Sequence, residues 1–211
     1  MKDGLSLIAV VMDRSGSMSS CREQTIDGFN EFLRQQKAAD GEAVVYYTQF
    51  DNEYEIVHNY KPVNDMPFLD HGSYIPRGST ALMDAVGRTI IKVGADLAAK
   101  AEDERPSVVI FVIQTDGYEN ASQEFTRQRI RDLISEHRDL WKWQFLFLGA
   151  SEESMREGAA MGVSRDTSLN YVGASSKNAF AAAASNVSHA RSTGQTRSYT
   201  QVERDEATEV Q

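Results

Sequence analysis

The residues of this sequence that could do chemistry are oxygen donors. Asp13, Ser15 and Ser17 stand at alternate positions in VVMDRSGSMSS, where an apolar run ends, and alternate side chains of a tight turn can face a common point. Asp116, in QTDGYEN, follows another apolar run in the same way, and Thr80 stands where a long loop meets a helical pattern. Two carboxylates and three hydroxyls are hard ligands, so the set indicates a divalent cation, with Mg²⁺ favoured and Mn²⁺ or Ca²⁺ as alternatives.

The ligand types also indicate what such an ion would do. Serine and threonine hydroxyls are neutral, so an ion held directly by Ser15, Ser17 and Thr80 keeps much of its charge. It could then accept an acidic side chain from a partner protein in a charge-assisted contact. The four histidines form no HExxH pair or similar spacing, so a zinc site built from His and Cys is not expected.

These donors need a scaffold that brings distant segments together. Residues 5–12 (LSLIAVVM), 108–113 (VVIFVI) and 143–148 (WQFLFL) are short apolar runs, typical of strands buried on both faces. Between them apolar residues recur at three- and four-residue steps, which predicts helices that contain Ile26 to Leu33, Leu82 to Leu97 and Ile130 to Ile134. This alternation predicts an α/β fold with a parallel sheet, whose ligands bind beyond the carboxyl ends of the strands.

Further elements complete the predicted domain. Residues 43–50 and 54–60 are separated by only three residues, which predicts a hairpin and an antiparallel strand at the sheet edge. A weaker strand is expected over residues 168–172, and the alanine-rich residues 176–190 predict a last helix with Ser176 as its cap.

The remaining segments show neither the strand nor the helix period. Residues 61–79 form a long irregular loop, and loops of this length are often functional. After residue 190 the sequence has few large apolar residues and many polar ones. We therefore expect one domain over residues 1–190 and a flexible polar tail over residues 191–211.

Three motifs in this order resemble a known family. D-x-S-x-S at Asp13, Ser15 and Ser17, Thr80 within GSTAL and Asp116 within TDG are similar to the metal-ion-dependent adhesion site (MIDAS) of von Willebrand factor type A (vWA) domains. The similarity covers approximately residues 5–191, and FDN, STALMDAV and FLGAS are similar to compact stand-alone bacterial and phage members. The resemblance implies a Rossmann-like, doubly wound sheet with helices on both faces. It also implies direct ligation by Ser15, Ser17 and Thr80, with Asp13 and Asp116 acting through water.

Membership would also imply a partner. Members of this family bind a ligand through the metal, so we expect a partner protein that offers an Asp or Glu. Many bacterial members sit beside an AAA+ ATPase module that this sequence lacks, which makes an AAA+ ATPase or an assembly component on another chain a candidate partner. The sequence departs from the commonest pattern at Arg14 and Ser79, where the family often has a small residue or Gly.

Composition excludes several other classes. The 211 residues are 41% hydrophobic, enough for one sizeable core, and carry a net charge of −9 with no run of Lys or Arg, so nucleic acid is not an expected partner. No apolar stretch approaches the roughly 20 residues that cross a bilayer, so no membrane partner is expected. A single cysteine, Cys21, and the lack of a signal-like segment favour a cytoplasmic protein.

Three alternatives remain open. In the first alternative, the D-x-S-x-S residues Asp13, Ser15 and Ser17 merely cap the first helix and bind no metal. The presence of Thr80 and Asp116 in the family's order favours the metal site instead. A metal-dependent phosphatase or other hydrolase would use Asp13 or a serine as nucleophile. However, Ser15 replaces the second Asp of acid-type phosphoryl transfer and no GxSxG or placed His base exists, so we expect no enzyme. In a structural subunit of a phage or multiprotein complex, the ion would only stabilise the fold.

Residues around these motifs have simpler expected roles. Asp51 is interpreted as a turn residue rather than a ligand, and Asn120 as a cap of the helix through Ile130. Cys21 and the two tryptophans are expected to pack in the core. Some loop residues could surround the ion and meet a partner, namely Arg14, Tyr74, Arg77 and Tyr118.

Overall fold

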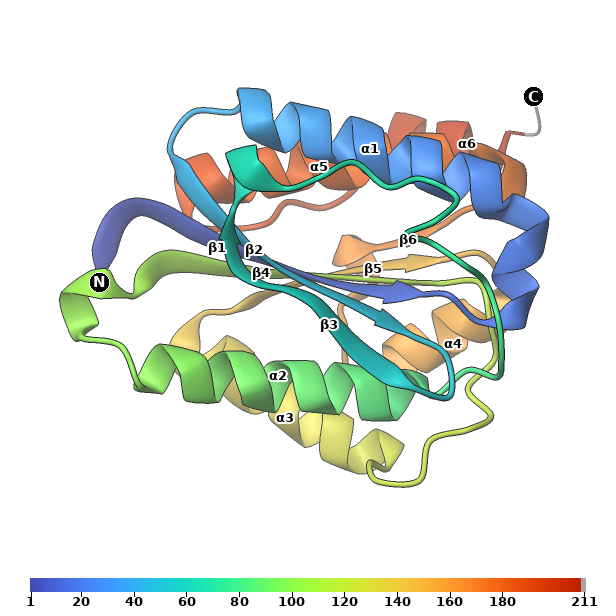
Figure 1. Cartoon of the computed structure of the whole chain (residues 1–211), viewed down its shortest axis with the longest axis horizontal. Coiled ribbons are helices and arrows are strands. Elements are labelled where there is room, and N and C mark those ends of the chain that lie inside the picture. Colours follow the sequence, from blue (N-terminus) through green and yellow to red (C-terminus); the bar gives the residue numbers. More distant parts are fainter. Residues whose placement is uncertain (210–211) are drawn as a thin grey trace.

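The computed structural model describes residues 1–209 and shows one six-stranded sheet between two layers of helices (Figure 1). The strand order is β3-β2-β1-β4-β5-β6, and every neighbouring pair is parallel except β2 with β3. The predicted doubly wound sheet with one antiparallel edge strand is therefore confirmed. The strands are β1 (Lys2–Asp13), β2 (Glu42–Phe50), β3 (Tyr54–Pro62), β4 (Pro106–Thr115), β5 (Gln144–Gly149) and β6 (Ser168–Asn170).

β1 lies in the middle of the sheet and is buried on both faces. It pairs with β2 on one side and β4 on the other. Its alternate side chains belong to two separate cores, Ile8, Val10 and Met12 to one and Leu7, Ala9 and Val11 to the other. Two buried faces explain why this strand is a continuous apolar run and why it ends abruptly in polar residues.

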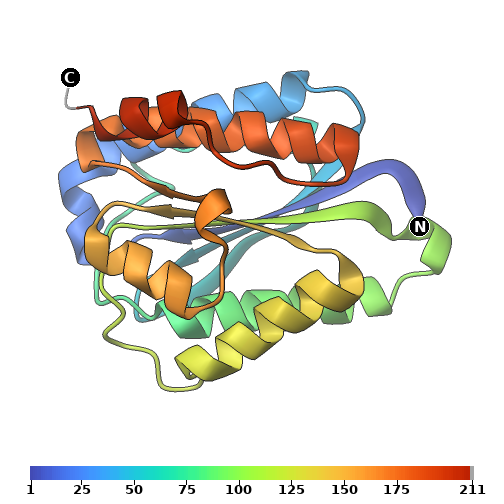
Figure 2. The same cartoon turned by 180° about the vertical axis from the view of Figure 1, so that it is seen from behind.

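The helices divide between the two faces of the sheet. α1, α5 and α6 cover one face, and α2, α3 and α4 cover the other (Figures 1 and 2). Their bounds are α1 (Arg22–Ala38), α2 (Leu82–Ala98), α3 (Arg127–Trp141), α4 (Glu152–Ala160), α5 (Ser176–Thr193) and α6 (Gln201–Thr208). No helix among the described residues is long and apolar enough to cross a membrane.

The connections create a switch point between β1 and β4. The chain leaves β1 through α1 to reach β2 on one side, and it reaches β4 on the other side through α2 on the opposite face. The loops that follow β1 and β4 therefore diverge at the carboxyl edge of the sheet, where ligands of doubly wound folds bind. Asp13 ends β1 and Asp116 directly follows β4.

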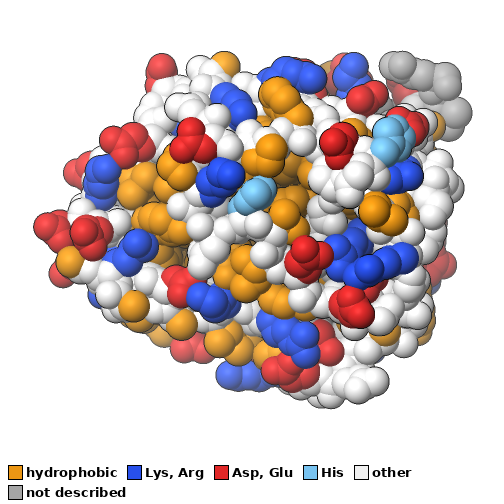
Figure 3. Space-filling model, viewed as in Figure 1, with side chains coloured by type: hydrophobic (Ala, Val, Ile, Leu, Met, Phe, Trp, Pro, Cys, Tyr) orange, Lys and Arg blue, Asp and Glu red, His pale blue; other side chains and the backbone are white. Residues whose placement is uncertain are grey.

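The β3 edge of the sheet is irregular and carries charge. Its register with β2 shifts twice, and Tyr60 has a positive φ of 53°. Figure 3 shows hydrophobic atoms between charged side chains on this side of the molecule. Bulges and charges of this kind discourage another strand from pairing with an exposed edge.

α4 is absent from the sequence-based prediction because only one large apolar side chain, Met155, packs from it against the core. Its fully buried residues are Ser154, Glu157 and Gly158, which show no apolar period. A Cβ atom at Gly158 would come within 2.7 Å of the Phe147 ring, so the helix backbone packs directly on that ring. α4 is therefore held on the sheet by close backbone packing, and its sequence lacks the apolar periodicity that predicts a helix.

The expectation of a flexible tail from residue 191 differs from the structure. α5 continues to Thr193. Beyond it, the side chains of Tyr199 and Ala207 are buried. Thr200 and Glu203 form a capping box that starts α6. α6 packs against α5 and the β6 region, and the backbone N–H of Val172 donates to the carbonyl of Ala207 (3.1 Å). Two buried side chains and local capping hold a segment whose overall composition is polar, while residues 210–211 lie outside the described part.

Two other local expectations are partly corrected. Ser176 is the first residue of α5 rather than its cap, which is Ser175, and neither side chain caps the helix. Trp143 is buried and stacks on Phe111, whereas Trp141 is 63% exposed at the end of α3. Cys21 is buried, as expected.

Replacing Tyr199 tests whether the C-terminal segment is part of the fold. We expect Tyr199→Ala to lower the free energy of unfolding by about 3 kcal/mol, because it leaves a cavity where a large ring is buried. Tyr199→Phe is the matched control: the Tyr199 hydroxyl is buried without a hydrogen-bond partner among residues 1–209, so its removal should cost little. Urea unfolding of both variants gives the comparison, and equal stability of the two would show that the segment does not pack.

Candidate metal centre

The structure brings the loop after β1 into contact with the loop after β4. Asp13 is buried, its Oδ1 accepts the backbone N–H of Ser15 (2.6 Å) and its Oδ2 accepts the hydroxyl of Thr115 (2.5 Å). The Ser15 and Ser17 hydroxyl oxygens lie 3.1 Å apart, and Ser17 Oγ donates to Asp116 Oδ1 (2.7 Å). Four of the five predicted residues thus form one polar cluster, although they are up to about a hundred positions apart in the sequence.

The hydroxyls of Ser15 and Ser17 do not cap the first helix. Ser15 precedes a short 3₁₀ helix over Gly16–Cys21, but its side chain makes no capping hydrogen bond. α1 begins after Cys21, also without a side-chain cap. The hydroxyls of Ser15 and Ser17 instead lie beside each other and beside Asp116.

Thr80 joins the cluster from the loop before α2. A Cβ atom at Gly117 would come 2.9 Å from Thr80 Oγ1 and 3.5 Å from Asp13 Oδ2, so both side chains approach the backbone at this glycine. A larger residue at position 117 would occupy the space between them. All five predicted residues therefore meet at the carboxyl edge of the sheet, and their role as ligands stays a prediction.

The backbone of Thr80 is held by the loop that follows Asp116. The Thr80 N–H donates to Asn120 Oδ1 (2.9 Å), and the Thr80 carbonyl accepts the N–H groups of Asn120 (3.1 Å) and Ala121 (3.2 Å). Asn120 therefore positions Thr80. The expectation that it caps α3 is wrong, because Thr126 accepts the N–H of Arg129 and supplies that cap.

The same loop also caps the start of α2, a role that sequence reasoning did not assign. Glu119 Oε2 accepts the N–H of Met83 (2.9 Å), and Ser122 Oγ accepts the N–H of Asp84 (3.1 Å). In return, the Asp84 carboxylate accepts the backbone N–H groups of Gln123, Glu124 and Phe125 (2.8–2.9 Å). The acidic residue in the first turn of α2 was a visible signal, but its partners are some forty residues away.

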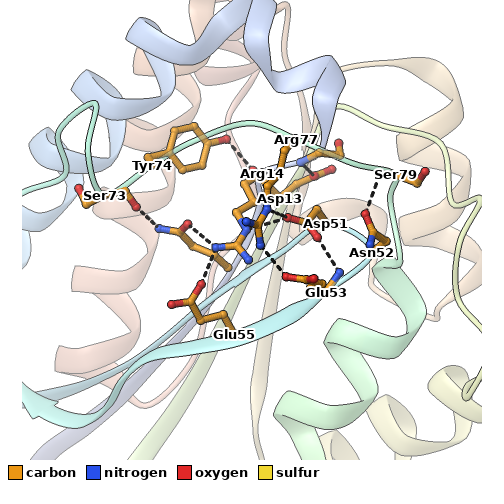
Figure 4. Close-up of polar contacts among 12 residues, drawn as sticks. Asp13, Arg14, Asp51, Asn52, Glu53, Glu55, Ser73, Tyr74, Arg77 and Ser79 are labelled. Atoms are coloured by element: carbon orange, nitrogen blue, oxygen red, sulfur yellow. Dashed lines mark hydrogen bonds and ion pairs between the residues drawn. The ribbon is translucent and has the colours of Figure 1, made fainter.

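Of the four residues expected to surround the ion, two are buried supports. The Tyr74 hydroxyl donates to the backbone carbonyl of Asp13 (2.6 Å), and Arg14 turns toward Asp51 (Figure 4). Tyr118 is 58% exposed, and the Arg77 side chain is about half exposed. Asp51 is a turn residue as expected, since its Oδ1 accepts the N–H of Glu53 (2.6 Å).

The donor set suits a cation because its carboxylates have no positive partner. No Lys or Arg within residues 1–209 forms an ion pair with Asp13 or Asp116. Burial raises the pKa of Asp13 to about 7, against the opposing hydrogen bonds from Thr115 and Ser15, and burial also raises the pKa of Asp116. A buried carboxylate without a counter-ion is costly, and a bound cation would remove that cost.

Hydroxyls are essential to this candidate site. The described residues contain no group of three or more His, Cys, Asp and Glu side chains that could hold a metal ion. Ser15, Ser17 and Thr80 must therefore complete any coordination sphere around the two carboxylates. This composition favours hard ions over soft ones.

Comparison with known proteins identifies the fold. No protein-family model matches the sequence, and no curated protein matches it. Among solved structures, proximal thread matrix protein 1 from the mussel byssus aligns over 85% of this chain with 13% identity and a TM-score of 0.61, and this chain spans about half (47%) of its length. The vWF domain of the type V pili tip protein Mfa5 from Porphyromonas gingivalis aligns over 96% of this chain and 99% of its own, with 10% identity and a TM-score of 0.62.

A third match is the TRAP protein of Plasmodium vivax. It aligns over 85% of this chain and 73% of its own, with 13% identity and a TM-score of 0.58. The chain therefore has the fold of a von Willebrand factor type A domain, as the three sequence motifs predict.

Asp13→Asn tests the cost of the buried carboxylate. Because the pKa of Asp13 is about 7 in the folded chain and near 3.8 in the unfolded one, the folded chain binds more protons between these values and its metal-free stability falls as pH rises through that range. We expect Asp13→Asn to raise the metal-free free energy of unfolding by about 2–4 kcal/mol at pH 8, and by much less at pH 5. Asp3→Asn, at an exposed position, is the control. If Asp13→Asn is less stable than the wild type at pH 8, Asp13 is not a buried carboxylate whose charge destabilises the metal-free fold.

Proposed function

We propose that this chain is a metal-dependent protein-binding module, which engages an acidic side chain of a partner protein through a divalent cation at the carboxyl edge of the sheet. The observation that carries the proposal is the meeting of Asp13, Ser15, Ser17, Thr80 and Asp116 at the β1/β4 switch point. When bound, the ion would supply a positive charge that a carboxylate can reach from outside. The residues of the chain hold and orient it.

Charge balance supports an outside anion as the last ligand. The three hydroxyls are neutral, and Asp13 lies behind Ser15, to whose N–H group it is hydrogen-bonded. If Asp13 and Asp116 act through water, the direct protein ligands leave the charge of the ion uncompensated. Because the direct protein ligands are neutral, a partner carboxylate is the group that completes the coordination with a charged ligand.

The spacing of the Ser15 and Ser17 hydroxyl oxygens is compatible with adjacent ligands of one ion. The Ser15 and Ser17 hydroxyl oxygens are 3.1 Å apart, close to the roughly 2.9 Å between adjacent ligands when metal–oxygen distances are about 2.0–2.1 Å. Adjacent ligands of seven-coordinate Ca²⁺ lie at a similar spacing, so the preference between the ions comes from the carboxylates that would act through water, because Mg²⁺ usually keeps several waters. We therefore propose Mg²⁺ as the first choice and Mn²⁺ as a substitute.

The solved neighbours support a divalent ion in this fold. One structure of proximal thread matrix protein 1 has a zinc-occupied MIDAS motif, and the Plasmodium TRAP structure is manganese-loaded. Each is only distantly similar in sequence to this chain. They support a metal-binding role in general, whereas the ion and the partner proposed here rest on the residues described above.

A groove beside the cluster gives a partner room to extend. It has a volume of about 640 Å³ and lies between the β2–β3 hairpin, the start of α2 and the loop after Asp116. Ala81 and Asn120, which adjoin or contact Thr80, form part of its lining. A partner segment with its carboxylate on the ion could place neighbouring residues here. From the family resemblance, an AAA+ ATPase or an assembly component is the partner class to test first, and the cytoplasm remains the expected location.

Binding is better supported than hydrolysis. No histidine within residues 1–209 is hydrogen-bonded to Ser15, Ser17 or Thr80, so these hydroxyls have no imidazole base. Ser15 occupies the position two residues after Asp13 where acid-type phosphoryl transfer requires an acid. The structural-subunit alternative predicts an ion that stabilises the fold without a partner, and this alternative can be separated by experiment.

Thr80→Val removes one proposed ligand and keeps the shape of the side chain. For the wild type, Mg²⁺ at about 100 times its Kd should add about 2.7 kcal/mol of stability and raise Tm by roughly 5–10 °C. We expect Thr80→Val to lose most of this rise and to lose Mg²⁺-dependent capture of the partner, with little change in metal-free Tm. Thr89→Val, at a buried threonine within α2, is the matched control and should retain both.

The outcomes separate the alternatives. Partner capture that survives both EDTA and Thr80→Val would refute binding through the ion, and an ion-dependent Tm without any ion-dependent partner would favour a structural subunit. Turnover of a phosphatase substrate that EDTA abolishes would favour the hydrolase. If binding is confirmed, replacing single Asp and Glu residues of the partner should identify one whose loss abolishes capture.

A further inference from the structure

We propose that Asp51 is a positioning residue of the metal centre, because its carboxylate ties the two loops that carry Ser15 and Thr80 to the β2–β3 hairpin. This inference rests on the proposed function, since it concerns the same metal centre. Asp51 lies outside the five-residue set, in the turn between β2 and β3. It acts through Arg14 and Arg77 (Figure 4).

The Asp51 carboxylate is fully used. Its Oδ2 accepts Nε of Arg14 (3.0 Å) and Nε of Arg77 (2.9 Å), while its Oδ1 accepts the N–H of Glu53 (2.6 Å). The residue is only 1% exposed. Burial alone would raise the pKa of Asp51, but the hydrogen bonds from Arg77, Glu53 and Arg14 outweigh it and hold that pKa below its ordinary value. A paired, charged carboxylate at this depth fixes the geometry of both guanidinium groups.

Backbone hydrogen bonds continue the same connection. The Ala81 N–H donates to the Asp51 carbonyl (2.9 Å), directly after Thr80 in the chain. The Arg77 N–H donates to the Arg14 carbonyl (2.8 Å), and the Gly16 N–H donates to the Gly78 carbonyl (3.1 Å). The loop before α2 thus runs beside the D-x-S-x-S loop, and Asp51 contacts both of them.

The outer contacts hold each arginine away from the metal centre. Arg14 Nη1 donates to Glu55 (2.6 Å), and Arg77 Nη2 donates to Glu53 (2.6 Å). Arg14 stands between Asp13 and Ser15 in the sequence, where a free guanidinium would be a rival cation for the carboxylates. Asp51 and Glu55 bind that guanidinium on the hairpin side, which leaves Asp13 without an internal cation.

A purely electrostatic role for Arg77 and a positioning role for Arg77 predict opposite effects of its removal on cation binding. If Arg77 acted only through its charge, removing it would reduce repulsion and strengthen the binding of a divalent cation. If Arg77 helps Asp51 to position the loop of Thr80, removing it weakens binding instead. Arg77 is suited to this test because about half of its side chain is exposed, so its loss should not prevent folding.

The experiment is calorimetric titration of the full chain with Mn²⁺ at pH 8 in low and moderate salt. We expect Arg77→Met to weaken Mn²⁺ binding about tenfold at both salt concentrations, with a metal-free Tm close to that of the wild type. Arg77→Lys should lose less, because one ammonium can replace a single contact to Asp51. Arg88→Met removes an arginine whose side chain is about as exposed as that of Arg77, breaks its ion pair with Glu124 and should leave the Kd unchanged.

The possible results have distinct meanings. An unchanged or tighter Kd for Arg77→Met would overturn the positioning role while leaving the proposed function intact. A wild type that does not bind Mn²⁺ would overturn both. Asp51→Asn is the second variant, and we expect it to weaken Mn²⁺ binding at least as much as Arg77→Met. A folded Asp51→Asn with wild-type affinity would also refute the proposal.

Discussion

The arrangement of the molecule around its polar edge depends on one buried carboxylate without a positive partner. Asp13 ends a strand whose side chains are buried on both faces, so its carboxylate cannot turn out to water. The nearest arginine in the sequence, Arg14, is paired with Asp51 instead. Burial raises the pKa of Asp13, which expresses the cost of keeping this charge in place. The fold tolerates a local instability that an external cation would relieve.

The backbone around Thr80 is fixed by hydrogen bonds although Thr80 lies in a long loop. It is held from one side by Asn120 and from the other by Asp51, whose carbonyl accepts the N–H of Ala81. The loop that carries it is also anchored by buried Met66, Leu69 and Tyr74. A long segment without helix or strand period is therefore fixed at several points, and this holds the Thr80 hydroxyl close to residues from two other loops.

The sequence was most informative where burial imposes a pattern. β1, β4 and β5 are continuous apolar runs because both of their faces are covered. The amphipathic helices α1, α2 and α3 show their period because only one side of each is buried. The five oxygen donors could be placed at one edge because the carboxyl ends of parallel strands meet there. α4 and α6 could not be predicted, because their packing relies mainly on Gly158, Ala207 and local caps, with Met155 as the one large apolar side chain of α4 that packs on the core. The partners of Asp51, Asp84 and Asn120 were equally hidden, because each of these contacts depends on the tertiary fold.

The motif after β1 shows how one short stretch can serve two polar centres. Asp13 faces β4, where Thr115 donates to its carboxylate, whereas Arg14 faces the β2–β3 hairpin and its carboxylates. Side chains of an extended chain alternate in direction, so the residue between two donors is turned away from them. An arginine can therefore stand between Asp13 and Ser15 without pairing with the Asp13 carboxylate, because Asp51 and Glu55 bind its guanidinium on the other side. Arg14, where the resembled family often has a small residue, is thus paired with the acids of the hairpin.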